Sequence, residues 1–375
     1  MENSISQTNN RLVSLDVFRG ITIVGMILVN NPGSWEYVYR PLLHAKWHGW
    51  TPTDFIFPFF LFIVGVAMSF SFGKRIERGD NRKQLFLKVI RRTLIIFALG
   101  FLLNFYWHFD ISSVRIPGVL QRIAVCYFFA SIIMLTLSTR WQIVLSVLLL
   151  VLYWAALKLI PVPGYGTGNL DAQGNLCWYI DSLLLAGHTW KWAPASGFDP
   201  EGILSTIPAI VSVFFGVFTG NWLRSKKEPM EKAAGLFVAA NIGLVLGVII
   251  HEWLPINKNL WTSSYVIFMT GMALHFFAFC YWLIDIKSYK KWAFPFVVFG
   301  TNAIVAYFTL SLFGKTLVYW EVGPSDEVLK SIVYENIYAS WAGDYFASLL
   351  YPLAMILIWF AFLFIMYRKK IFIKV

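Results

Sequence analysis

Ten stretches of this chain are each roughly 20 residues long and mostly apolar, with polar or charged connections between them. An α-helix needs about 20 apolar residues to cross the hydrocarbon core of a bilayer. Composition agrees, because only 14% of the residues are charged, against about 25% in soluble proteins. The sequence therefore predicts an all-α integral membrane protein whose main partner is the lipid bilayer. The predicted spanning segments are 16–31, 54–73, 86–107, 118–137, 141–160, 203–223, 233–253, 262–284, 292–313 and 349–367.

Lysine and arginine are distributed unevenly between the connections. Cytoplasmic loops of membrane proteins carry an excess of these residues. If all ten segments cross and the N-terminus is cytoplasmic, 22 of the 31 basic residues lie on the cytoplasmic side. They are Arg11, Arg19, Arg140 and those in 74–92, 224–232, 287–291 and 368–374. Both termini are then cytoplasmic, residues 1–375 form a single membrane domain, and the net charge of +11 needs no nucleic-acid partner.

The long connections fall on the opposite side of the membrane. With the residues at their margins, they hold 13 of the 20 acidic residues and five of the six histidines. Loops on a rigid scaffold commonly carry binding and chemistry, so the working surface is expected to face outward. The first residues are polar and no cleavage site follows, so the first apolar segment is expected to stay as a membrane helix.

The first group of polar residues lies between the first two segments, where Asn30, His44 and Asp54 stand among tryptophans and tyrosines. One interpretation is an interfacial aromatic belt, in which Asp54 and Thr53 cap the second helix. The other is a histidine paired with a carboxylate. A neutral imidazole titrates near ~6.5 and can take a proton from an amine or hydroxyl nucleophile. Spacing alone does not show whether His44 and Asp54 touch, so both interpretations stay open.

A second group, Arg115, Gln121 and Arg122, marks the outer entry to the fourth segment. Arg122 lies about one turn inside the membrane, where a charge costs up to about 2.5–3.5 kcal/mol at the bilayer centre. Such a side chain either extends to the interface or faces an anion, such as Asp54 or a ligand phosphate.

A third group precedes the eighth segment and consists of Asn257, Lys258, Asn259 and Trp261. The hydroxyls that follow, from Thr262 to Ser264, are explained by helix capping, but the Asn-Lys-Asn run is not. Asn302 is an amide inside the ninth segment, where a helix–helix hydrogen bond and a site residue are equally good explanations. No P-loop, zinc-ligand or nucleophile-elbow motif occurs, so neither a metal site nor a nucleotide-hydrolysing pump is predicted.

Taken in order, several motifs resemble the heparan-α-glucosaminide N-acetyltransferase family and its bacterial relatives. They are residues 16–20, 44–54, 114–122, 161–164, 199–202, 255–261 and 367–372. The resemblance implies a membrane enzyme that transfers the acetyl group of cytoplasmic acetyl-CoA to the amine of a glucosamine-type sugar on the far side. It implies that His44 is the essential catalytic residue and that Asn30 and Asp54 belong to the active site. It places Arg115 and Arg122 in a signature motif, and it implies that two copies can form a homodimer.

The residues agree with this chemistry. An amine acceptor needs a base on its own side of the membrane, and His44 is on that side. Asn30 is a candidate hydrogen-bond donor to the oxyanion of the thioester. Arg122 and Lys258 are candidate contacts for the polyanionic coenzyme A. Gln121, Asn257, Asn259, Trp261 and Asn302 complete the candidate binding residues, together with Arg115. Whether His44 acts as a base or carries the acetyl group covalently stays open.

Lysosomal members of this family have an additional luminal N-terminal part and one more helix. This chain starts ten residues before Arg11, so a bacterial inner-membrane protein acting on a periplasmic amino sugar or glycan is expected. The main alternative is an amino-sugar transporter, which predicts substrate flux without turnover of coenzyme A. A membrane acyltransferase that uses another acyl donor or O-acetylates a hydroxyl acceptor is a third possibility, because a histidine base serves either nucleophile.

Overall fold

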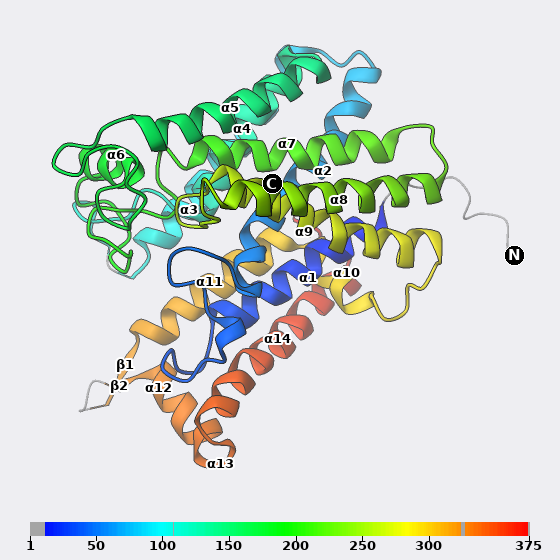
Figure 1. Cartoon of the computed structure of the whole chain (residues 1–375). Coiled ribbons are helices and arrows are strands. Elements are labelled where there is room, and N and C mark those ends of the chain that lie inside the picture. Colours follow the sequence, from blue (N-terminus) through cyan, green and yellow to red (C-terminus); the bar gives the residue numbers. More distant parts are fainter. Residues whose placement is uncertain (1–11, 108, 324–326, 374–375) are drawn as a thin grey trace, which may run out of the picture.

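The structure, a computed structural model, describes residues 12–107, 109–323 and 327–373. Helices make up nearly all of its regular structure (Figure 1), which confirms the all-α prediction. The long helices are α1 (Val13–Asn30), α2 (Ile56–Glu77), α3 (Arg82–Phe105), α4 (Val119–Thr136), α5 (Thr139–Leu159), α7 (Thr206–Arg224), α8 (Pro229–His251), α9 (Ser263–Cys280), α11 (Ala303–Tyr319) and α14 (Asp344–Arg368).

Shorter elements connect these helices and fill the loops. They are the 3-10 turns η1 (Arg40–Leu42) and η2 (Pro52–Phe55), the helices α6 (Leu176–Leu184), α10 (Phe294–Thr301), α12 (Leu329–Val333) and α13 (Ser340–Ala342), and the π-helical turns η3 (Tyr281–Ile286) and η4 (Tyr334–Ala339). The strands β1 (Glu321–Val322) and β2 (Glu327–Val328) pair antiparallel, with Glu321 opposite Val328.

Within the described residues, eight helices are long and apolar enough to cross a membrane, and the bent pair α10–α11 makes a ninth if it counts as one span. Each coincides with a predicted segment. The predicted segment 86–107 also forms a helix, α3, which carries Lys88, Arg91 and Arg92 between its apolar residues. A multi-pass membrane protein is thus confirmed, whereas ten crossings and the orientation stay predictions. Arg11 and Lys374, both used in the orientation argument, lie outside the described residues.

The predicted ninth segment, 292–313, is not one helix, and that expectation was wrong. α10 and α11 meet at an angle of 81°. Asn302 stands between them with a non-helical backbone (φ −124°, ψ 44°). Its side-chain Nδ2 donates to the carbonyl of Ile371 (3.0 Å), and its Oδ1 accepts from the N–H of Ile373 (3.0 Å). Asparagine competes with helix hydrogen bonding in this way, so the break attaches the C-terminal segment to the bundle.

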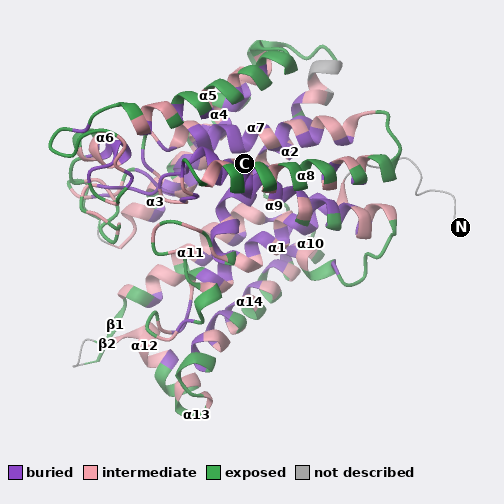
Figure 2. Ribbon diagram, viewed as in Figure 1, coloured by how far each residue is buried: buried purple, intermediate pink, exposed green. Residues whose placement is uncertain are grey.

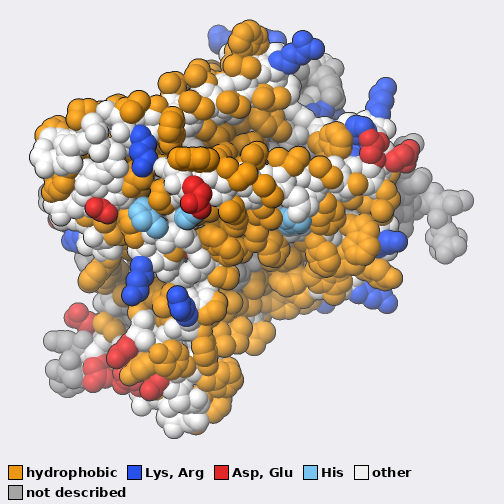
Figure 3. Space-filling model, viewed as in Figure 1, with side chains coloured by type: hydrophobic (Ala, Val, Ile, Leu, Met, Phe, Trp, Pro, Cys, Tyr) orange, Lys and Arg blue, Asp and Glu red, His pale blue; other side chains and the backbone are white. Residues whose placement is uncertain are grey.

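The helices form a central group and an outer group. α1, α2, α7 and α9 are mostly buried, whereas α5, α8 and α14 turn much of their surface outward (Figure 2). The main contacts in the bundle pair α2 with α7, α8 with α9, α1 with α10 and α3 with α4. Hydrophobic side chains cover most of the visible helical surface (Figure 3), as expected of a surface in contact with lipid.

The α2–α7 pair depends on a close approach of the two backbones. A Cβ atom at Gly65 of α2 would overlap the carbonyl oxygen of Val213, and one at Gly216 of α7 would overlap that of Phe62. Small residues drive helix packing inside membranes in this manner, because lipid offers no hydrophobic driving force between helices. These glycines fix the central pair from which α2 extends outward to the loop that carries His44.

Replacing Gly65 by valine is therefore expected to separate α2 from α7. Overpacking of this kind costs about 1–3 kcal/mol of folding free energy. The Gly65→Val protein should melt at a clearly lower temperature than wild type in detergent. Ala239→Val is the matched control, because Ala239 is exposed on α8 and its change should leave the melting temperature unaltered. Equal melting of both variants would contradict the close approach.

Candidate active site

Asp54 is a buried carboxylate at the start of α2, held in place by the loop before it. Thr51, rather than Thr53, is the N-cap of η2, and it forms a reciprocal capping box with Asp54. Oδ2 of Asp54 accepts from the backbone N–H groups of Thr51 (2.9 Å) and Ala45 (3.1 Å). The Tyr265 hydroxyl of α9 donates to the Asp54 backbone carbonyl (2.7 Å). A buried polar group needs such partners, and together they fix the orientation of Asp54.

His44 contacts this carboxylate directly. Its Nδ1 lies 2.6 Å from Oδ1 of Asp54, so the pairing that spacing left open is present. The His44 side chain is 43% exposed, while that of Asp54 is 1% exposed. The short contact assigns the ring proton to Nδ1, facing the carboxylate, which leaves the Nε2 lone pair for a ligand.

Lys258 completes this cluster from the loop before α9. Its Nζ lies 3.1 Å from both ring nitrogens of His44 and 3.9 Å from Oδ1 of Asp54. Equal distances to two ring nitrogens place the ammonium over the face of the imidazole. Burial and the Lys258 charge lower the pKa of His44, although the hydrogen bond to Asp54 works in the opposite direction. His44 is therefore a neutral imidazole at pH 7.

Arg115 joins two carboxylates in the loop before α7. Its Nε and Nη2 donate to both oxygens of Asp199 (2.8 and 2.6 Å), and Nη2 also donates to Glu201. Burial tends to raise the pKa of Glu201, but the charges of Arg115 and other nearby cations lower it, so the carboxylate is ionised. Arg115 was predicted as a site residue, but its partners were not. Its bidentate pairing with Asp199 is the geometry for which arginine is suited.

Arg122 is buried, being 2% exposed. Its Nη2 donates to the carbonyl of Gly202 (3.2 Å) and to the Ser205 hydroxyl, and its guanidinium lies 5.2 Å from the centre of the Trp261 ring. Extension to the interface is thus not observed. Within the part of the chain that the structure describes, no carboxylate pairs with Arg122, and its Nε and Nη1 have no hydrogen-bond partner.

Two further candidates lie on the Lys258 loop. Asn257 is buried, and its Oδ1 accepts from the N–H of Leu260 (2.9 Å), while its Nδ2 lies 3.3 Å from Nδ1 of His48. Asn257 therefore shapes the loop that presents Lys258. Asn259 is half-buried on the same loop.

Asn30 and Asn302 lie at opposite ends of the bundle. Asn30 is the last residue of α1 and is exposed, at the end where α1 contacts η2 and therefore near Asp54. No hydrogen bond among the described residues joins it to Asp54. Asn302 is buried next to α10, whose Gly300 packs against the carbonyl of Asp16 near the start of α1. The structure thus brings Asn30, but not Asn302, to the His44 end.

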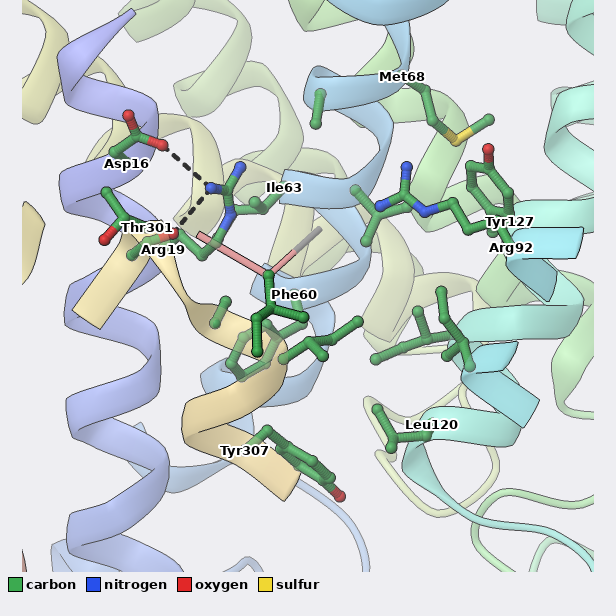
Figure 4. A pocket seen from close by; sticks show the side chains of 18 of the residues that line it. Asp16, Arg19, Phe60, Ile63, Met68, Arg92, Leu120, Tyr127, Thr301 and Tyr307 are labelled. Carbon is green, nitrogen blue, oxygen red and sulfur yellow. Dashed lines mark hydrogen bonds and ion pairs between the residues drawn. The ribbon is translucent and has the colours of Figure 1, made fainter. Parts of the chain in front are cut away.

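An elongated cavity of about 590 Å³ runs through the bundle (Figure 4). Asp16 and Arg19, near the start of α1, lie at one end, and Leu120 of α4 and Tyr307 of α11 lie at the other. Leu120 belongs to the first turn of α4, at the same end of the bundle as His44. The volume is in the range of about 300–1,000 Å³ that small-molecule sites occupy.

Two arginines border this cavity. Arg19 donates to Asp16 (3.1 Å) and to the carbonyl of Gly300 (3.0 Å). The guanidinium of Arg92 lies 4.8 Å from the centre of the Tyr127 ring, and its Nε has no hydrogen-bond partner. The cavity thus has mostly apolar walls, with cationic side chains toward the end of the bundle where α1 begins. Among the described residues, no cluster of three or more histidines, cysteines and carboxylates suited to a metal ion occurs.

Four residues of the two sites were not predicted from the sequence: Glu201, Tyr265, Arg19 and Arg92. Arg92 carried a usable signal, because a cation inside an apolar segment generally faces a cavity or a partner. Tyr265 carried none, since an aromatic residue in a membrane helix is ordinary.

Known proteins resemble this chain over most of its length. The family described as "Heparan-alpha-glucosaminide N-acetyltransferase, catalytic" matches residues 11–249. The human heparan-alpha-glucosaminide N-acetyltransferase is 29% identical over 97% of this chain, and the mouse protein is 28% identical over 98%. The chain spans about 60% of the length of these relatives. With the family match covering well over half of its residues, this chain belongs to the heparan-alpha-glucosaminide N-acetyltransferase family.

Proposed function

We propose that this protein is a membrane N-acetyltransferase that moves the acetyl group of acetyl-CoA to the amine of a glucosamine-type sugar. The observation that carries the proposal is the contact between His44 and the buried Asp54 carboxylate, in a chain of this family. The reaction and the acceptor class are those named for the human and mouse relatives, the heparan-alpha-glucosaminide N-acetyltransferases.

His44 is the base in this proposal. The amine nitrogen attacks the carbonyl carbon of the thioester while its proton passes to Nε2 of His44. The C–S bond then breaks, and coenzyme A leaves as the thiolate, which recovers a proton from the imidazolium. Asp54 stabilises the imidazolium and holds the ring in the tautomer that has Nε2 free. Because the side chain of His44 is partly exposed, an acceptor can reach it from the loops.

Lys258 has two roles in the same step. Its ammonium over the His44 ring keeps the imidazole neutral, and so able to accept a proton. The same charge lies where negative charge develops on the thioester oxygen, and fixed charges of this kind stabilise such an oxyanion. Asn30, exposed at the same end of the bundle, remains the second candidate donor.

The elongated cavity is the proposed path of acetyl-CoA. Arg19 and Arg92 supply cations for its phosphates near the N-terminal end, and the acyl end points toward Tyr307 and Leu120. Leu120 is two residues before Arg122, whose guanidinium lies 5.2 Å from the centre of the Trp261 ring on the Lys258 loop. In this proposal the inner end of the cavity therefore leads toward the proposed base.

The topology proposed from the charge distribution gives this path a direction. With ten crossings and both termini in the cytoplasm, coenzyme A enters from the cytoplasm and the sugar meets His44 on the outer side. A bacterial inner membrane and a periplasmic acceptor fit this arrangement.

An amino-sugar transporter is the second candidate, favoured by the bent pair α10–α11. Broken helices mark substrate sites in many transporters. Here, however, the side chain of Asn302 at the break is bonded to the C-terminal segment. Transport of glucosamine into proteoliposomes without any formation of free coenzyme A would favour this candidate over the transferase. Acetylation of a hydroxyl instead of the amine would identify an O-acetyltransferase.

Loss of the base should abolish transfer. For His44→Ala, we expect the rate of acetyl transfer from labelled acetyl-CoA to glucosamine to fall by about 10²–10⁴-fold, the usual contribution of a general base. The purified protein in detergent is assayed beside His48→Ala, which removes an exposed histidine from the same loop and should keep most of the activity. Full activity of His44→Ala would refute this mechanism.

Removing either of the two charged side chains beside His44 should shift the pH dependence of acetyl transfer, and the two removals should shift it in opposite directions. The neutral base is lost as pH falls through the pKa of His44, so the acid limb of kcat/KM reports this pKa, which lies below the ordinary value near 6.5. Lys258→Met removes a cation that lowers the pKa, so the acid limb should move to higher pH. Asp54→Asn removes an anion that raises the pKa, so it should move to lower pH, with a much lower rate. Shifts in the same direction would contradict the assignment.

Arg92 tests the path of acetyl-CoA. Arg92→Gln should raise KM for acetyl-CoA about tenfold, the effect of losing one charge-assisted hydrogen bond, while KM for glucosamine stays constant. Arg82→Gln, at the exposed start of the same helix, is the control. An unchanged KM for acetyl-CoA in Arg92→Gln would remove this residue from the path.

A further inference from the structure

A second cavity, the α4 trough, lies between α4, α5 and α7. Its volume is about 660 Å³. Although only two residues separate α4 from α5, both helices contact α7 and barely contact each other, while α4 packs mainly on α3. The space left over α7 is the trough. It is separate from the elongated cavity, because the two share no lining residue among those described.

The trough has the dimensions of one lipid chain. The residues of α4 that line it are Gln121, Arg122, Val125, Phe129 and Ile133. From Gln121 to Ile133 the helix advances about 18 Å, at about 1.5 Å per residue. One leaflet of the hydrocarbon core is about 15 Å thick. Phe129 is 45% exposed, so this side of the trough is open to the surroundings of the bundle.

The polar side chains that α4 contributes to the trough all lie at one end of it. Beyond the first turn of α4, the α4 residues in the trough are all apolar. At the first turn stand Gln121 and Arg122, which are 4% and 2% exposed. Nε2 of Gln121 and Nε and Nη1 of Arg122 are buried without a hydrogen-bond partner. A ligand that fits both ends has an apolar chain and a polar head.

The positive charge of Arg122 at the polar end of the trough favours a ligand with an anionic head group. Trp261 covers one face of the Arg122 guanidinium, but its ring does not accept from the N–H groups, which point outward in the plane of the guanidinium. Glu201 also lines the trough and lies within reach of the Arg122 charge, but its carboxylate accepts its hydrogen bond from Arg115 and leaves Nε and Nη1 of Arg122 unpaired. Unpaired donors on a buried cation are costly, and a phosphate offers several acceptor oxygens together with the opposite charge.

We propose that the α4 trough binds an anionic phospholipid of the surrounding bilayer. Its phosphate accepts hydrogen bonds from Arg122 and Gln121, and one acyl chain lies along Val125, Phe129 and Ile133. Coenzyme A is a poor fit, because its polar adenosine and pantetheine groups would meet apolar side chains. The site is a lipid site of the fold itself and stands whether or not the protein transfers acetyl groups.

The experiment measures lipid binding to the delipidated full-length protein by native mass spectrometry. Dioleoylphosphatidylglycerol should bind wild type at one site, and dioleoylglycerol, which lacks the phosphate, should bind at least about tenfold more weakly. Arg122→Gln should weaken binding of the phospholipid by a similar factor. Equal binding of the two lipids, or undiminished binding by Arg122→Gln, would overturn the proposal.

A second pair of variants tests the chain-binding part without touching the charge. Val125→Phe fills the trough and should weaken phosphatidylglycerol binding, with a folded protein confirmed by its melting curve. Val147→Phe adds the same bulk at an exposed position of α5 outside the trough and should bind as wild type does. Equal binding by both variants would place the lipid elsewhere.

If a prenyl-phosphate-linked amino sugar displaces phosphatidylglycerol and is itself acetylated, the occupant is a lipid-linked acceptor and the phospholipid assignment fails.

Discussion

The burial of one carboxylate determines how the loops at the His44 end are arranged. An ionised group that is 1% exposed is tolerated only where hydrogen bonds and charges replace water. Asp54 obtains these from the backbone of its own loop, from the His44 ring and from the charge of Lys258. The start of α2, the long loop before it and the loop before α9 therefore have to meet at this point. The proposed base and its neighbouring cation are oriented by the same interactions that make the burial of Asp54 possible.

A second group of charged residues, Arg115, Asp199 and Glu201, lies near the cluster of His44, Asp54 and Lys258. Arg115 satisfies Asp199 and Glu201, and Asp199 also accepts from the backbone N–H of Trp190 (2.9 Å). This closes the loop before α7 over the first turn of α4. Lys258 lies 3.1 Å from both ring nitrogens of His44, and burial together with this charge lowers the pKa of the ring. The anions are thus divided between two cations. Asp199 and Glu201 pair with Arg115 in a structural ion pair, whereas Asp54 lies beside Lys258 and the proposed base, His44.

The elements of this fold that follow from local composition were predictable, and those that depend on distant partners were not. Nine of the ten predicted segments coincide with single helices, because apolar length alone requires them, and the segment 292–313 does not. The break at Asn302 was missed, since its cause is a hydrogen bond to backbone about 70 residues away. His44, Asp54 and Lys258 were named from their residue types, but Lys258 lies more than 200 residues along the chain from the other two, and no spacing reveals its contact with them. The pairing of Glu201 with Arg115 was not predictable for the same reason, because the two residues lie on different loops.

The first turn of α4 explains how one bundle holds two cavities of different chemistry. Leu120 faces the elongated cavity, whereas its neighbours Gln121 and Arg122 face the trough, because successive residues of a helix point about 100° apart. This turn has no side-chain cap of its own. Asn104 at the end of α3 fixes it by donating to the carbonyls of Arg115 (2.9 Å) and Pro117 (2.8 Å). Both cavities thus share a wall that is anchored from α3, so a polyanionic co-substrate and a lipid can occupy neighbouring spaces without meeting.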